Sequence, residues 1–161
     1  MSNAYFKVPQ PINEPVKSYK PGSPEREELK KKLTELKSKQ IEVPLIIGGE
    51  EVRTGNTEKM VIPHNHSHIL GVYHKAGKKE VDMAVEAALE ARKTWAEMPW
   101  EHRVSVFLKI ADLLAGPWRS TINAATMLGQ SKTAYQAEID SAAELVDFYR
   151  YNCYFMAQLM Q

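Results

Sequence analysis

The sequence predicts an α-rich α/β fold, in which a few short strands are followed by a group of helices. Short apolar runs bounded by glycine and proline occur between Val43 and Tyr73, and this pattern is typical of strands. After Gly77, apolar residues recur at helical spacing almost to the end of the chain, which indicates amphipathic helices. The beginning of the chain is rich in proline, which favours an extended segment ahead of the strands and helices.

Composition places the chain among globular proteins of one domain. It has 161 residues, of which 43% are hydrophobic and 25% are charged. The net charge of +1 argues against a nucleic acid as partner. The single cysteine, Cys153, excludes an internal disulfide and a cysteine-based zinc site, and we interpret it as a small core residue.

The sequence gives no sign of a membrane or of a targeting segment. No apolar run approaches the roughly 18 residues of a membrane span, so we expect no membrane partner. The N-terminus lacks the apolar region of a signal peptide and the arginine-rich character of a transit peptide. The expected location is therefore the reducing cytoplasm.

Residues 1–23 are expected to form an extended arm. Its prolines are Pro9, Pro11, Pro15 and Pro21. Proline lacks the amide donor and restricts the residue before it, so such an arm needs another surface to lie on. The motif Ser23-Pro24-Glu25 then predicts a helix start, with serine as N-cap and proline at the first helical position. This helix should run to about Lys39.

The strand region begins with a predicted β-hairpin, since two short apolar runs flank Gly48-Gly49 between Val43 and Val52. Met60–Ile62 and Ile69–Tyr73 are two more predicted strands. Between them lie three histidines, His64, His66 and His68. Alternating histidines invite a metal interpretation, but no cysteine or carboxylate lies close enough in sequence to complete a site. We favour a polar turn and expect no metal.

Three helices are predicted after the strands, over residues 79–97, 100–115 and 119–128. Pro99 separates the first two, and Gly129 is expected to stop the third. Their apolar faces are Val81, Val85, Ala88 and Trp95; Val104, Phe107, Leu108, Ala111 and Leu114; and Ile122, Ala125 and Met127.

From about Gln136 to Gln161 the pattern is one long helix. Its predicted core face consists of Ile139, Ala142, Ala143, Val146, Arg150 and Cys153. Glu138 lies about 100° from Ile139, at the margin of this face. The last turns are apolar and no stop signal follows, so we interpret this end as the middle of something larger. We expect the isolated chain to fold poorly or to self-associate.

No motif of known chemistry stands out from spacing alone. The segment Gly129-Gln130-Ser131-Lys132-Thr133 is superficially like a phosphate loop, but the glycines that a Walker loop requires are absent. We interpret it as a turn between helices. The sequence also lacks the G-x-G-x-x-G and G-x-S-x-G patterns.

Several segments taken together resemble the aldehyde dehydrogenase family. The Gly-Gly-Glu hairpin, helices like VDMAVEAALEARKTW and RVSVFLKIADLL, a Gly-x-x-Lys segment and a long helix occur in the family's order. FKVPQPINEPVKSYKPGSPER at 6–26 and GQSKTAYQAEIDSAAELVDFYRYN at 129–152 are similar to the subfamily that oxidises L-glutamate γ-semialdehyde. The resemblance implies that residues 24–161 are the N-terminal part of an aldehyde dehydrogenase domain, incomplete at its C-terminus.

The resemblance also implies a reaction, the NAD-dependent oxidation of L-glutamate γ-semialdehyde, derived from 1-pyrroline-5-carboxylate, to L-glutamate in proline breakdown. In the family a cysteine thiolate attacks the aldehyde, hydride passes to NAD, and a glutamate activates water. The family's nucleophile, base and dinucleotide site lie beyond residue 161, and neither Cys153 nor Asn152 matches their motifs. We therefore expect no catalytic residue here, and neither activity nor NAD binding by this chain alone. The expected partners are a missing C-terminal remainder and, in the complete enzyme, the substrate and further copies in a homo-oligomer.

One residue of this chain is implied in substrate binding. In the subfamily the glutamate of the QAEID segment, here Glu138, faces the aldehyde channel and can meet the substrate's α-amino group. A carboxylate suits that place, because an ammonium group needs a charge-assisted acceptor. From the residues alone, Glu138 is equally an ordinary acid in the first turn of a helix.

Two other classes of function stay open at this point. The chain could be a non-catalytic helical module retained for interaction or assembly. A nucleic-acid surface at Lys30-Lys31-Lys32 is the weaker alternative, because Glu27, Glu28 and Glu35 neutralise that run. A downstream reading frame that encodes a cysteine-containing dehydrogenase segment would favour the enzyme over the module.

Overall fold

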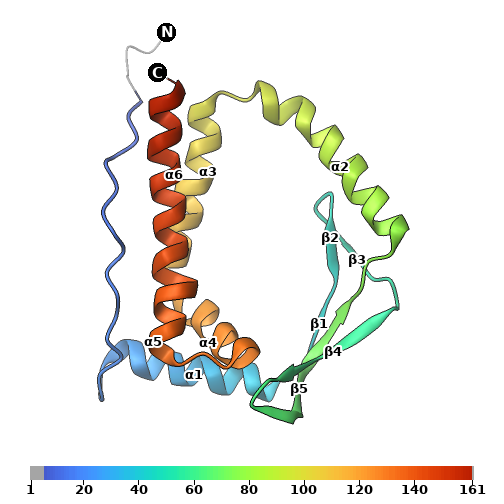
Figure 1. The fold of residues 1–161 in the computed structure, drawn as a ribbon, viewed down its shortest axis with the longest axis vertical. Helices are drawn as coiled ribbons and strands as arrows, with labels where there is room; N and C mark the ends of the chain where they lie inside the picture. The colour runs from blue at the N-terminus through green and yellow to red at the C-terminus, as the bar shows by residue number, and fades with distance from the viewer. Residues whose placement is uncertain (1–5, 161) are drawn as a thin grey trace.

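The computed structural model describes residues 6–160, so the first five residues of the expected arm and Gln161 lie outside it. The elements follow the predicted order, with strands between a first helix and a group of later helices (Figure 1). In chain order they are α1 Pro24–Ser38, β1 Ile41–Val43, β2 Leu45–Ile47, β3 Glu50–Val52, β4 Thr57–Ile62, β5 Asn65–His74, α2 Lys78–Glu97, α3 Trp100–Ala115, α4 Arg119–Gln130, α5 Ala134–Ala137, the π-helical η1 Glu138–Ala143, and α6 Glu144–Met160. The prediction of an α-rich α/β fold is confirmed.

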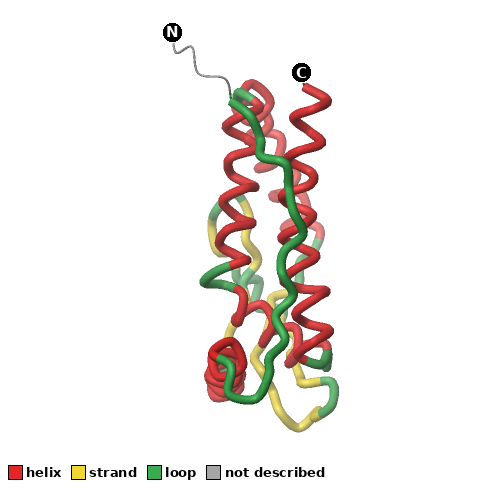
Figure 2. Tube along the Cα trace, turned by 90° about the vertical axis from the view of Figure 1, so that its left-hand side faces the viewer, coloured by secondary structure: helices red, strands yellow, loops and turns green. Residues whose placement is uncertain are grey.

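The N-terminal arm is an extended strap laid on the helices. Residues 6–20 contain no helix or strand and run beside α6 in both views (Figures 1 and 2). Val8 is 3% exposed and shares a core with Val104 of α3 and with Cys153 and Ala157 of α6. The arm is therefore held at its start by apolar burial, as its lack of internal hydrogen bonds requires.

The strands form two small sheets, because Pro44 divides the run that the sequence suggested was one strand. β1 pairs in parallel with β5, and β4 completes this sheet in the order β1-β5-β4. β2 and β3 form a separate antiparallel hairpin, which begins at Leu45 and not at Val43. Gly48 and Gly49 have φ values of 61° and 88°, the left-handed pair that a tight hairpin turn needs.

The histidine segment is only partly a turn. β5 begins at Asn65 and pairs with Ile62, so the turn is confined to Pro63 and His64, while His66 and His68 belong to the strand. The polar-turn prediction was therefore wrong for those two histidines. Within residues 6–160, no three side chains of His, Cys, Asp or Glu converge in a way that could hold a metal ion.

Helix α2 was predicted to bury an apolar face, and this prediction was wrong, because none of its side chains is buried. Val81 and Val85, which belong to its predicted apolar face, are 54% and 53% exposed. In Figure 1 this helix arches away from α3 and contacts mainly the β2–β3 hairpin. No helix described here is both long enough and apolar enough to cross a membrane.

The predicted inward face of helix α4 was only partly correct, since Met127 packs against a buried core cluster and Ile122 is half-buried. Ala125 is exposed. The buried side consists of Arg119, Ser120, Asn123, Ala124 and Leu128. The helix also continues through Gly129 and ends at Gln130, where Ser131 takes the left-handed conformation with φ 58°. An apolar pattern could not identify this face, because polar partners in other elements are what allow it to be buried.

Gly71 permits the parallel pairing of β1 with β5, and its replacement should damage the sheet. A Cβ atom at Gly71 would lie 2.0 Å from the carbonyl oxygen of Ile41, so Gly71→Ala should destabilise the chain by more than 1 kcal/mol. Gly129→Ala is the matched control, since nothing lies within 4 Å of its Cβ position and alanine should add roughly 0.5–1 kcal/mol in a helix. Urea unfolding followed by circular dichroism measures both. Equal effects of the two substitutions would contradict the steric account.

Candidate functional site

The start of the long helix contains a π turn, which changes which residue faces inward. The backbone N–H of Glu144 donates to the carbonyl of Ile139, five residues earlier, and residues 138–143 are π-helical. The extra residue places Glu138 above Ala143, where a regular helix would place Ile139. Glu138 is consequently 0% exposed, and its predicted position at the margin of the core was wrong.

The Glu138 carboxylate is saturated with donors from two other parts of the chain. Its Oε1 accepts hydrogen bonds from the backbone N–H of Lys17, at 2.7 Å, and from the guanidinium of Arg119. Its Oε2 accepts from the hydroxyl of Tyr19, at 2.7 Å, and from Nδ2 of Asn123, at 2.8 Å. The arm and α4 therefore meet at this one buried side chain.

Arg119 connects Glu138 to the middle of the arm. It is 3% exposed, and besides Glu138 it donates to the carboxylate of Glu14 and to the carbonyl of Pro15. The second oxygen of Glu14 accepts from Nη1 of Arg150 at 2.6 Å. Two arginines thus face two glutamates, and the charges balance. We refer to Glu14, Arg119, Glu138 and Arg150 as the ionic cluster.

The surroundings of the ionic cluster keep its members in defined protonation states. Burial alone raises the pKa of Glu138, but the bonds from Arg119, Lys17 and Tyr19 outweigh it and hold the pKa below its usual range. Burial and the Glu138 carboxylate both raise the pKa of Tyr19. Burial lowers the pKa of Arg119, but Glu138 and Glu14 outweigh it, so the net shift is upward. Glu138 and Arg119 are therefore a charged pair, and Tyr19 is a neutral donor.

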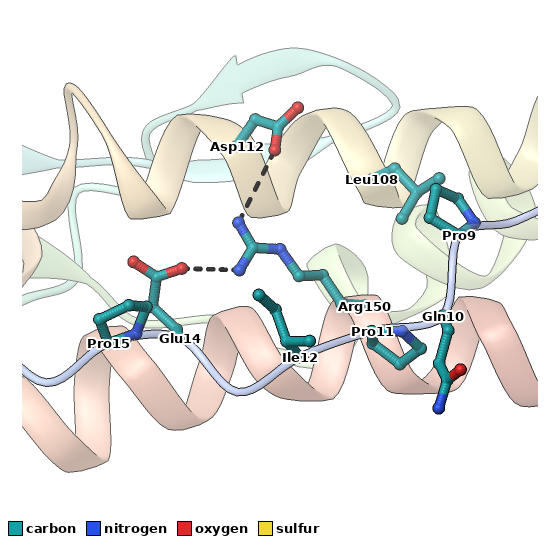
Figure 3. A pocket seen from close by; sticks show the side chains of 9 residues that line it. All are labelled: Pro9, Gln10, Pro11, Ile12, Glu14, Pro15, Leu108, Asp112 and Arg150. Atoms are coloured by element: carbon teal, nitrogen blue, oxygen red, sulfur yellow. Dashed lines mark hydrogen bonds and ion pairs between the residues drawn. The ribbon is translucent and has the colours of Figure 1, made fainter.

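Two hollows border the arm. Figure 3 shows the first, a cavity of about 470 Å³ between the arm, α3 and α6, where Arg150 lies between Glu14 and Asp112. The second is an open groove of about 840 Å³ on the other side of the arm, lined by η1, α6 and arm residues. Its lining includes Phe148 and Phe155 beside Asp140, Glu144 and Asp147. An apolar groove with carboxylates along it suits a cationic or amphipathic molecule better than an anion.

Cys153 is not a nucleophile in this structure. It is 4% exposed, its Sγ lies 3.8 Å from the carbonyl oxygen of Val104, and burial raises the pKa of the thiol. A reactive cysteine needs the opposite environment, partly exposed and electropositive. The interpretation of Cys153 as a core residue is confirmed.

Residues 6–160 do not provide the cradle that a dinucleotide needs. Such a cradle requires a glycine-rich turn between a strand and a helix, with free N–H groups for the phosphates. The junction between β5 and α2 has Gly77, whose N–H already donates to Glu80 at 2.8 Å. In the segment that is superficially like a phosphate loop, Lys132 pairs with Asp140 and Thr133 caps α5. Neither of these two segments therefore fits the phosphates of NAD.

Of the residues in the ionic cluster, the sequence pointed only to Glu138 and to the polar Arg150 on a core face. Glu14 and Arg119, like their neighbours Tyr19 and Asn123, were missed. Glu14 and Tyr19 bind partners more than a hundred residues away along the chain, and Arg119 and Asn123 lie on a face of α4 that was not predicted to be buried. One usable signal existed, since Arg119 and Asn123 stand four residues apart beside Ala124.

Comparison with known protein families defines the class of protein. A model of the aldehyde dehydrogenase family matches residues 51–161. The chain therefore belongs to the aldehyde dehydrogenase family.

Within that family the chain is similar to delta-1-pyrroline-5-carboxylate dehydrogenases. It is 48% identical to the one from Agaricus bisporus over 97% of this chain and 29% of that protein, and 47% identical to the mitochondrial one from Homo sapiens over 91% and 26%. The crystal structure of the enzyme from Mycobacterium tuberculosis bound with NAD superposes with a TM-score of 0.96, at 47% identity, over 99% of this chain and 30% of that one. The chain thus spans less than a third of the length of these relatives, and its fold is that of their N-terminal part.

Arg119 should be the most sensitive residue of the ionic cluster. Arg119→Met leaves the Glu138 carboxylate buried without its cation, and removal of one partner of a buried pair costs about 3–5 kcal/mol. Arg53→Met is the control, because its pair with Glu51 lies in solvent and such surface pairs add little to stability. Urea unfolding of the two variants measures the difference, and equal losses of stability would contradict the role given to Arg119.

Glu138 should also make stability depend on pH. Because its folded pKa is depressed, its contribution is present above the unfolded value of about 4.3 and is lost as pH falls through the folded pKa. We expect the free energies of unfolding of the native chain and of Glu138→Gln to converge as pH falls below about 4.3. Unfolding curves between about pH 7 and pH 3 test this. Curves that stay parallel throughout would show that Glu138 does not titrate with folding.

Proposed function

We propose that this chain forms the N-terminal part of an NAD-dependent dehydrogenase that oxidises L-glutamate γ-semialdehyde, from 1-pyrroline-5-carboxylate, to L-glutamate. The single observation that carries the proposal is the match to the Mycobacterium tuberculosis enzyme, with 47% identity and a TM-score of 0.96 over 99% of this chain. A match over nearly the whole chain supports one shared architecture, and the alternative of an unrelated helical module has no comparable support.

In this proposal the chain contributes positioning and a substrate-side surface. The ionic cluster fixes the arm against α4 and α6, and the groove beside the arm offers aromatic rings and carboxylates to a small amphipathic molecule. The nucleophile and the cofactor site come from the part of the relatives' length that this chain does not span. Cys153 cannot take the nucleophile's place, because it is buried and its thiol pKa is raised.

The substrate role of Glu138 stays a hypothesis, and a positioning role competes with it. Both carboxylate oxygens already accept hydrogen bonds from four residues, so an incoming ammonium group would have to displace a donor such as Tyr19. A carboxylate that is already ionised and shared by Arg119 is nonetheless a strong acceptor. The two roles predict different kinetics for the same substitution.

The expected location and assembly also remain predictions. Relatives from Homo sapiens and Dictyostelium discoideum are named as mitochondrial, whereas the sequence favoured the cytoplasm for this chain. A homo-oligomer of the complete enzyme is likewise proposed from the family resemblance.

The activity is tested by comparing the 161-residue chain with a full-length dehydrogenase that carries this segment. With NAD and L-glutamate γ-semialdehyde, the complete enzyme should produce NADH absorbance and the chain alone should produce none. Turnover by the isolated chain that scales with its concentration and survives repurification would overturn the assignment of the chemistry to the missing part. A complete enzyme that oxidises other aldehydes but not this one would overturn the proposed substrate.

Glu138→Ala in the complete enzyme separates the two roles of that residue. Substrate binding predicts that KM rises on the order of tenfold for L-glutamate γ-semialdehyde but little for a plain aliphatic aldehyde, because only the first carries an ammonium group. Positioning predicts that kcat/KM falls equally for both substrates and that Arg119→Met does the same. Circular dichroism should confirm that the helices remain intact in both variants.

A further inference from the structure

A hollow of about 520 Å³ lies where the C-terminal parts of α1 and α4 meet the three-stranded sheet, and we call it the sheet hollow. Figure 1 shows the end of α1 beside the lower end of this sheet. The helices form one wall and β1, β4 and β5 form the other, so both walls belong to this chain. The volume is within the roughly 300–1,000 Å³ of small-molecule sites. The sheet hollow shares no lining residue with the cavity or the groove beside the arm.

The inside of the sheet hollow is mainly apolar. Leu36 and Leu128 line it from the helices, and Met60 and Leu70 line it from the strands. Ile41, which also lines it, is 50% exposed. Two apolar walls that face each other across an open space leave hydrocarbon surface in contact with water. A ligand with an apolar part would remove that surface from water, which is the favourable term in binding of this kind.

The charged groups on the lining of the sheet hollow are positive in excess. Lys39 of the α1 end and Lys59 of β4 both line it, and both are exposed. Among the described residues its one lining carboxylate is Glu35, which accepts a hydrogen bond from Lys32 at 2.8 Å. Lys32 does not line the hollow, so Glu35 is neutralised from outside it. Lys39 and Lys59 therefore give the hollow a net positive charge beside its apolar walls.

We propose that the sheet hollow binds a small amphipathic anion. Its unbranched apolar chain lies between the sheet and the helices, and its single anionic head group lies at Lys39 and Lys59. The apolar walls supply the affinity, and the two ammonium groups select the charge of the head group through charge-assisted hydrogen bonds. A cation with the same chain would meet two like charges. The site goes beyond the proposed function, which requires neither this hollow nor such a ligand.

Titration calorimetry with decanoate, below the concentration at which it forms micelles, tests the site. It is carried out on the 161-residue chain and on a full-length dehydrogenase that carries this segment. From octanoate to decanoate the affinity should rise about fourfold for each added methylene, because the chain enters an apolar space. Decylamine has the same chain with a cationic head group and should bind on the order of tenfold more weakly. Circular dichroism at the end of each titration should show the protein still folded.

Three variants locate the binding. Lys59→Glu should weaken decanoate on the order of tenfold, since it replaces an attractive charge with a repulsive one. Lys109→Glu makes the same change at an exposed position of α3 and should leave the affinity unchanged. Ala125 is an exposed residue that lines the hollow, so Ala125→Trp should fill the space and abolish binding. If this larger side chain disturbs folding, the comparison of Lys59→Glu with Lys109→Glu still decides.

Four results would overturn the proposal. Equal binding of decanoate and decylamine would show that the lysines select no charge. An affinity that does not change with chain length would show that the apolar walls are not used. Equal effects of Lys59→Glu and Lys109→Glu would place the ligand elsewhere. Binding by the 161-residue chain but not by the full-length dehydrogenase would show that other parts of the longer protein cover the hollow.

Discussion

A carboxylate cannot stay ionised in the interior without donors, and Glu138 imposes this constraint on the arm and on α4. With 0% of its surface exposed, it needs Arg119 from α4 and the Lys17 and Tyr19 donors from the arm all at once. Tyr19 takes a left-handed backbone conformation, φ 51°, as it delivers its hydroxyl. Such a conformation costs free energy and persists where its surroundings determine it. The path of the arm is thus determined by the hydrogen bonds that the Glu138 side chain requires.

The ionic cluster contributes more to the specificity of the fold than to its stability. Desolvation of buried ions offsets much of their attraction, so a buried pair adds little to a well-packed apolar alternative, while an incomplete one is costly. An arm of prolines makes few backbone bonds and could slide along α6. Apolar burial of Val8 holds the arm at its start but discriminates weakly between neighbouring registers. Glu14, shared by Arg119 and Arg150, favours one register, because a shift of the arm would remove its carboxylate from both arginines.

Periodicity in the sequence was enough to predict the order and type of nearly every element, since helical and strand patterns are local. It failed where a single residue changes the phase of the pattern, and where a buried side chain pairs with a residue far away along the chain. Pro44 ends one strand and starts another in a different sheet, and the π turn at Glu138 rotates the helix start by one position. The polar part of the buried face of α4 was missed, because Arg119 and Asn123 are buried where they pair with Glu138 and Tyr19. Secondary-structure propensity depends only on nearby residues, so it cannot indicate polar partners that are distant along the chain.

The two ends of the molecule therefore satisfy their side chains in different ways. Around η1 and α6, every charge of the ionic cluster has its partner within the chain, so this part is determined by contacts already present. Along α2, by contrast, an exposed apolar stripe of Val81, Val85 and Leu89 has no counterpart among residues 6–160. An ionic cluster closed on itself gains nothing from a further partner, whereas an exposed apolar stripe gains from every Å² that a partner removes from water.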